Sequence, residues 1–402
     1  MFTMVMLLIY RLGNVIPVPY IDTQAMVNYF ETTLSNTILG LYNAMSGSAF
    51  SQASVLALGI QPYINSSIIV QLLTIAIPAL ERWAKEEGEI GKKKIARLTR
   101  YVTMGLGLLL GFAYYMMLKN YGSILSEDGI LPAIVIILAF AAGSAVVMWM
   151  GEQITEFGIG NGISMILFAN IICGIPGTIA RMSGFVWWMN VIVVVAIIAL
   201  IVFIVFINDA ERRIPIQYAK RVVGRKIYGG QSTNLPIKVS MSGVMPVIFA
   251  QSICSIPATI CAFIGKTEGW WYDNVFSPSS WAYAVFYFLM IFFFSWFYST
   301  IQYDPVEIGN NLKKNGGFIP GFRPGKPTSD FIHKVINKIL VFGALYLAIV
   351  ALLPIVAGNL VPEVQNLALG GTSAIIVVGV ALETVKALEA QMLMRHYKGF
   401  LD

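Results

Sequence analysis

Stretches of about 20 uncharged, mostly apolar residues recur along this chain, with polar segments between them. Residues 60–77 are typical, because they carry no charge and have nearly the ~20 residues that an α-helix needs to cross a bilayer core. The pattern predicts ten spans, at residues 1–17, 60–77, 101–118, 131–150, 160–175, 185–207, 241–264, 281–300, 336–357 and 371–393. We therefore predict an all-α integral membrane protein, with Glu383 and Lys386 as charges near the end of its last span.

Residues 40–58, just before the second span, have a different character. They consist mainly of Ser, Ala, Gly and Met with isolated Leu and Val. The segment is too polar to cross a bilayer and too apolar for a solvated loop. It is predicted to be a short amphipathic piece that folds back towards the span at 60–77.

Composition and charge predict the surroundings of the chain and its orientation in the membrane. Of its residues, 57% are apolar and 12% are charged, so lipid is the predicted solvent. Of the 27 Lys and Arg residues, 23 lie in the segments 82–100, 212–238, 313–338 and 386–398, which share one side of a ten-span topology. By the positive-inside rule that side is the cytoplasm, which places both termini in the cytoplasm and residues 40–58 on the outer side.

Two pairs of short motifs indicate an internal repeat. The second and seventh spans both begin G-x-x-P-x-I, at residues 59–64 and 243–248. The fifth span has Gly-Ile-Ser at 162–164, and the tenth has Gly-Thr-Ser at 371–373, each with an aliphatic residue three positions later. The matched order predicts two related five-helix halves, residues 1–184 and 185–402.

The repeat places branched aliphatic residues where a small-solute transporter would carry polar groups. These positions are Ile60, Ile64, Ile163, Leu167, Ile248 and Ile376. A ring of such side chains closes a pore by dewetting and yields to a larger passing chain. The alternative for each residue is ordinary contact with lipid or with the protein core.

The loops at 208–240 and 302–335 are long, basic and rich in glycine. Contact with anionic lipid and control of topology would account for their charge. Their length favours a further role, such as docking to ribosomal RNA or to an acidic protein surface.

Several long segments resemble the SecY family, the channel subunit of the bacterial Sec translocon. They are LGIQPYINSSIIVQLL, MWMGEQITEFGIGNGISMILFAN, YAKRVVGRKIYGGQSTNLPIKV with MSGVMPVIFA, and NLKKNGGFIPGFRPGKPT. The resemblance covers nearly the whole chain and implies a clamshell of two five-helix halves around an hourglass pore. It implies transport of unfolded secretory proteins and lateral release of signal helices into lipid, with no cofactor and no bond-breaking chemistry.

The resemblance also implies roles for individual residues. The pore ring falls on the six aliphatic residues named above. The plug, residues 41–57, includes Leu41, Tyr42, Met45, Phe50 and Val55. The lateral gate places Asn65 opposite Ile256 and Ile260. The docking surface includes Lys220, Arg221, Arg225, Lys226 and Arg323.

The partners implied by the resemblance are SecE and SecG, the ATPase SecA, the ribosome, preproteins that bear signal sequences, YidC or SecDF, and anionic lipids. The family usually begins with a basic amphipathic segment before its first span, whereas this sequence starts inside that span at Met1. The missing basic segment is expected to affect contacts with SecE.

Two other classes of protein remain as alternatives. A secondary transporter requires a polar site at the membrane midplane. A membrane-embedded enzyme requires clustered His, Asp or Glu, for which Glu152 and Glu156 are the nearest candidates. The three cysteines, Cys173, Cys254 and Cys261, lack metal-binding spacing, and no G-x-x-x-x-G-K-[ST] nucleotide-binding motif is present in the sequence.

Overall fold

The computed structural model describes the chain except residues 35–37, 86, 121–123, 128, 183–186, 219–220, 224–225, 229–231, 241–242, 265–273, 276, 278–279, 361–370 and 399–402. A helix lies at each of the ten predicted spans. These helices are α1 (Phe2–Gly13), α4 (Gln61–Ala76), α6 (Gly88–Asn120), α7 (Ile130–Phe157), α8 (Gly162–Met182), α9 (Trp187–Asp209), α10 (Met245–Ile264), α11 (Trp281–Gln302), α13 (Lys326–Leu360) and α14 (Gly371–Lys398).

By length and hydropathy, six helices in the described residues can each cross a membrane, namely α6, α7, α8, α9, α11 and α13. A seventh span arises if α4 is joined to α5 (Pro78–Lys85), although the chain bends by 107° between them. Helices α1 and α10 are apolar but shorter, and α14 is not among the spans that meet these criteria. The fold is therefore helical and apolar as predicted, and length and composition support six or seven of the ten spans.

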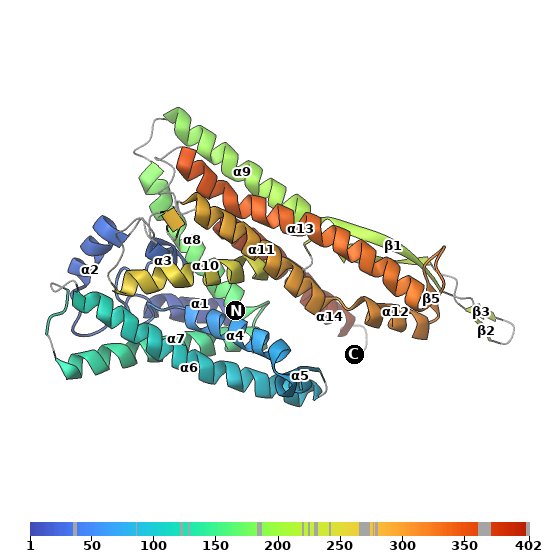
Figure 1. Cartoon of the computed structure of the whole chain (residues 1–402), viewed down its shortest axis with the longest axis horizontal. Coiled ribbons are helices and arrows are strands. Elements are labelled where there is room, and N and C mark those ends of the chain that lie inside the picture. Colours follow the sequence, from blue (N-terminus) through green and yellow to red (C-terminus); the bar gives the residue numbers. More distant parts are fainter. Residues whose placement is uncertain are drawn as a thin grey trace.

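The long helices form two groups, seen along the lower and upper edges of Figure 1. Helices α4, α6 and α7 pack side by side in one group, and α11 and α13 pack together in the other. Between the groups, α10 contacts α4 and α6, while α8 contacts α14. The four helices that carry the repeated motifs therefore contact one another in pairs, α4 with α10 and α8 with α14.

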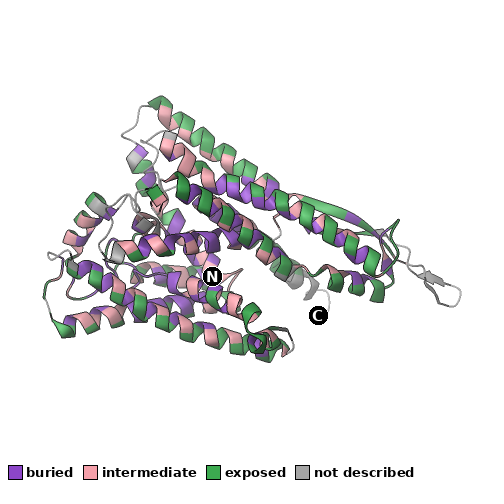
Figure 2. Ribbon diagram, in the orientation of Figure 1, coloured by how far each residue is buried: buried purple, intermediate pink, exposed green. Residues whose placement is uncertain are grey.

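Exposed residues run along the outer faces of the long helices (Figure 2), and many of them are large and apolar. Helix α9 is the clearest case, since Val191, Val195, Ile198 and Val202 are all exposed. Exposed aliphatic residues along a whole helix fit a hydrocarbon surrounding. Of the buried apolar clusters, one draws on helices of both groups, including α4, α8, α10 and α14, and is called the central hydrophobic cluster.

Several short elements lie between α1 and α4 in the sequence. Helix α2 (Thr23–Tyr29) begins at Asp22, whose carboxylate accepts hydrogen bonds from the backbone nitrogens of Gln24 and Ala25. A short π-helix (Phe30–Leu34) and α3 (Ile38–Ser46) follow, and α3 leads through a series of turns into α4.

The two long basic loops contain strands, which the sequence analysis did not predict. Strand β1 (Glu211–Tyr218) pairs antiparallel with β4 (Ser232–Lys238) and with β5 (Gly317–Phe318), in the order β4-β1-β5. A hairpin of β2 (Arg221–Val223) and β3 (Lys226–Tyr228) extends from this sheet. Buried residues of β1, β4, α12 (Pro305–Lys314) and the start of α13 form one hydrophobic cluster. The loops at 208–240 and 302–335 thus build one small unit together.

Candidate functional site

The six aliphatic residues selected from the sequence repeat meet in the central hydrophobic cluster. Five of them are 4% exposed or less, namely Ile60, Ile64, Leu167, Ile248 and Ile376, and Ile163 is partly buried against them. Four helices supply them, because Ile60 and Ile64 belong to the start of α4, Ile163 and Leu167 to α8, Ile248 to α10 and Ile376 to α14.

The backbone of α7 lies close to this group. A Cβ atom added at Gly151 would lie 3.6 Å from Cδ1 of Ile60 and 3.7 Å from Cγ1 of Ile163. These two side chains, from helices far apart in the sequence, therefore pack over the same glycine.

The predicted plug contributes Met45 to this apolar cluster and is bound from several sides. Met45 and Phe50 are buried, at 7% and 1% exposure. The Phe50 ring packs edge-on against Tyr114 at 4.7 Å between centroids, and the Tyr114 hydroxyl donates to the Phe50 carbonyl at 2.8 Å. The Val55 nitrogen donates to the carbonyl of Ile16 at 2.9 Å. Leu41 lies in α3, and its side chain is outside the described residues.

Two plug side chains contact α10, the helix that lies between the two groups. The Tyr42 hydroxyl takes part in hydrogen bonds with Ser255 and Thr259. The Met45 sulfur accepts from the side-chain nitrogens of Gln61 at 3.1 Å and Gln251 at 3.8 Å. Because Gln61 belongs to α4 and Gln251 to α10, one methionine is contacted from both sides of the interface between these helices.

The three residues predicted for the lateral gate differ in how far they are exposed. Asn65 is half-buried, and its side-chain oxygen has no hydrogen-bond partner in the part of the chain that the structure describes. Ile256 and Ile260 are 44% and 52% exposed on one face of α10. Helices α4 and α10 do pack together, as the prediction requires.

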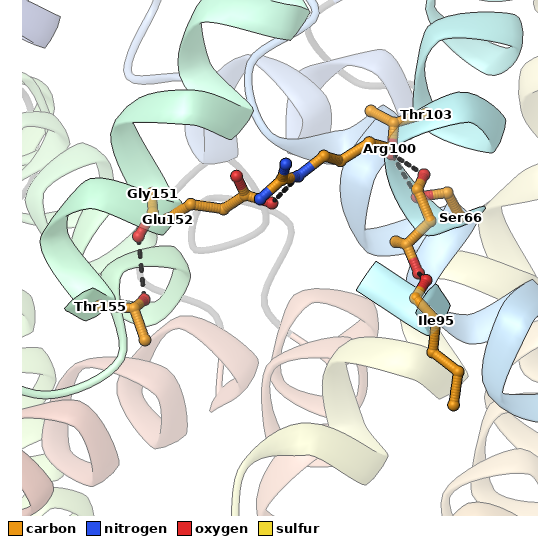
Figure 3. A network of polar contacts seen from close by, with 8 residues as sticks. Ser66, Ile95, Arg100, Thr103, Gly151, Glu152 and Thr155 are labelled. Carbon is orange, nitrogen blue, oxygen red and sulfur yellow. Dashed lines mark hydrogen bonds and ion pairs between the residues drawn. The ribbon is translucent and has the colours of Figure 1, made fainter. Parts of the chain in front are cut away.

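Polar contacts join α4 to α6 and α6 to α7 (Figure 3). The hydroxyls of Ser66 and Thr103 share a hydrogen bond between α4 and α6. Three residues earlier on α6, Nε of Arg100 lies 2.9 Å from Oε1 of Glu152 on α7, and the two side chains point towards each other in Figure 3. Glu152, one of the two carboxylates considered for an enzyme, is thus engaged in an ion pair.

The residues predicted for docking lie in or beside the unit built from the two basic loops. Arg323 is exposed, and its carbonyl accepts from the Thr328 hydroxyl at 2.8 Å. Arg221 and Lys226 belong to strands β2 and β3, and their side chains are outside the described residues. Lys220 and Arg225 lie wholly outside the described residues.

Several polar residues around the plug were not predicted from the sequence. Tyr10, Arg11, Asn14 and Asn170 contact its helix or one another, as do the two glutamines at Met45. Arg11 was visible as the only charge in the first span. The asparagines gave no such signal, because single amides are common in membrane helices.

Solved structures with the same arrangement of helices are protein-conducting membrane channels. One, described as "The structure of a protein conducting channel", aligns with a TM-score of 0.66 over 97% of this chain and 91% of that chain, at 18% identity. Sec61 in the canine ribosome-channel complex aligns with a TM-score of 0.62 over the same shares of each chain, at 17% identity. The fold is that of the SecY/Sec61 channels.

Sequence comparison narrows this class to one family. Residues 54–385 match the SecY family model. The protein translocase subunit SecY of Streptomyces scabiei is 42% identical over 420 residues, covering 100% of this chain and 96% of that protein. The corresponding subunit of Bacillus licheniformis is 40% identical over 415 residues, with 100% and 95% covered. The chain belongs to the SecY family, and so it is a multi-pass membrane protein and a channel subunit of the protein translocase.

Proposed function

We propose that unfolded secretory proteins cross the membrane between two halves of this chain, residues 1–184 and 185–402, each with five spans. The observation that carries the proposal is the packing of Ile60, Ile64, Ile163, Leu167, Ile248 and Ile376 in one cluster, to which helices of both halves contribute. This set is the pore ring. Branched aliphatic side chains exclude water and ions while the channel is closed, and they pack around a polypeptide that passes.

The plug closes the outer side of the ring. Its position is held by contacts with α6, α7 and α10, so displacement of the plug requires those contacts to break. A signal helix enters between α4 and α10, where Asn65, Ile256 and Ile260 line the lateral gate, and is released there into lipid. Separation of α4 from α10 also separates Gln61 from Gln251, which links opening of the gate to release of Met45.

The unit built from residues 208–240 and 302–335 lies on the cytoplasmic side, together with both termini, because most basic residues gather there. Lys220, Arg221, Arg225, Lys226 and Arg323 form its docking surface for SecA and for the ribosome. The energy for transport comes from these partners or from the proton-motive force. SecE and SecG complete the membrane complex, YidC or SecDF act with it, and anionic lipids contact its basic surface.

Protease protection of a secretory precursor tests this function. Proteoliposomes that hold the chain with SecE and SecA are given ATP, precursor and then protease. We expect a protected precursor with the wild type and strongly reduced protection with Arg323→Glu. Asp330→Lys, an exposed charge change seven residues away, serves as the matched control and should retain protection. Absence of protection with the wild type, when a family member in the same vesicles gives it, would contradict the proposal.

A further inference from the structure

The C-terminal end of the plug helix α3 is bound by three side chains from other parts of the chain. Nδ2 of Asn170 donates to the carbonyl of Met45 at 2.8 Å, Nδ2 of Asn14 to that of Ser46 at 3.3 Å, and Nη1 of Arg11 to that of Gly47 at 3.2 Å. Three consecutive carbonyls thus receive three separate donors. The last carbonyls of a helix have no partner within it, so such donors satisfy groups that would otherwise be buried unpaired.

The donors themselves are placed tightly. Asn170 is fully buried on α8 and also donates to the Tyr10 hydroxyl at 2.8 Å, while Asn14 is 5% exposed just after α1. Gly47 has a φ of +68°, and a Cβ there would lie 2.5 Å from Nη1 of Arg11 and 2.7 Å from Oδ1 of Asn170. The close approach of Arg11 and Asn170 to the plug therefore requires glycine at position 47.

These polar side chains are costly unless the plug is in place. Arg11 is the only charged residue of α1, and a charge within a membrane helix is unfavourable without a partner. The negative end of the α3 dipole supplies a favourable partner for a cation. The side-chain oxygens of Asn14 and Asn170 have no hydrogen-bond partner among the described residues, so the gain from these amides lies in their nitrogens, which bind the plug.

We propose that Arg11, Asn14 and Asn170 form a latch that holds the plug in its closed position and sets how readily the channel opens. The three are positioning residues, since they act through the plug and do not line the apolar ring. The latch rests on the proposed channel function, and it adds a determinant of opening that is separate from both the ring and the lateral gate.

The latch is tested first by the position of the plug, without any transport. Ser51, buried in the plug, is replaced by cysteine in a chain whose native cysteines are alanine, and the rate of labelling by a water-soluble maleimide is measured. We expect Asn170→Leu and Arg11→Met to raise this rate several-fold. Arg11→Lys, which keeps a donor, should restore most of the protection. Ile172→Ala, an exposed position on α8, should label as the parent does.

Ion conductance of the closed channel in planar bilayers provides the second readout. Asn170→Leu and Arg11→Met should leak several-fold more than the parent. A disulfide between Pro17→Cys and Ser54→Cys, which are paired in a β-bridge, should return the leak to the parent level by tethering the plug. A leak that persists with the tether closed would indicate general loosening and overturn the latch. Unchanged labelling and conductance in a folded Arg11→Met, Asn170→Leu double variant would also overturn the latch. Failure of precursor transport in the wild type would count against the channel function and leave the labelling result to decide the latch.

Discussion

Gly59 and Gly243 adopt the same backbone conformation at equivalent places in the chain. Each lies two residues before the first residue of its helix, α4 or α10, and their φ angles are +53° and +61°. Both helices begin with an isoleucine of the central cluster within their first turns. The G-x-x-P motif found in the sequence thus corresponds to one repeated turn that orients two helices towards the apolar centre.

Replacing either glycine by alanine should destabilise the protein. A left-handed conformation costs a residue with a Cβ about 1 kcal/mol more than glycine. We expect Gly59→Ala and Gly243→Ala to lower the thermal unfolding midpoint in lipid nanodiscs by similar amounts. Gly174→Ala is the control, because a Cβ there meets no atom within 4 Å. If both variants have the same unfolding midpoint as the control, the left-handed turns before α4 and α10 do not require glycine.

Gly143 on α7 should be required for the closed position of the plug. A Cβ at this position would lie 1.9 Å from the Val55 carbonyl oxygen, which is too close for any contact. Gly143→Ala should therefore displace the plug and increase maleimide labelling of Ser51→Cys, at a stability cost of about 1–3 kcal/mol. Gly105→Ala on α6 meets no atom within 4 Å and should leave labelling unchanged. Equal labelling in the two variants would show that α7 does not pack on the plug.

The Arg100–Glu152 ion pair should be dispensable for transport. Its side chains are 54% and 23% exposed, and ion pairs of this kind contribute about 1 kcal/mol or less. We expect Glu152→Gln to keep precursor protection within about twofold of the wild type, and the Arg100→Gln, Glu152→Gln double variant to behave alike. A large loss of protection in a stably folded Glu152→Gln would instead assign this carboxylate a chemical or gating role.

Much of the architecture could be predicted from the sequence, because a membrane helix leaves a long apolar signal. The position of a helix at every predicted span follows from this signal, as does the helical, apolar fold. The helix boundaries were less predictable. Helices α6 and α13 begin at Gly88 and Lys326, well before the spans expected at 101 and 336, since basic residues lengthen a helix without adding hydropathy.

The strands and the plug contacts could not be found in this way. The β1–β4 pairing joins residues of one loop, but β5 comes from the other loop, and the buried alternation in β1 covers only Ile214 and Ile216. The hydrogen bond from Asn170 to Met45 joins residues 125 positions apart, and no local pattern marks it. By contrast, part of the apolar ring could be proposed early, because Ile64 and Ile248 occupy matched positions of the repeat, as do Leu167 and Ile376.

The central claim is that the buried aliphatic ring is the barrier of the closed channel. Ion conductance of Ile248→Lys in planar bilayers tests it most directly. A lysine at this buried position should draw water into the ring, so we expect a large rise in basal conductance. Ile90→Lys, at an exposed position near the start of α6, should conduct no more than the wild type. Wild-type conductance in a stably folded Ile248→Lys variant would contradict the assignment of the ring as the gate.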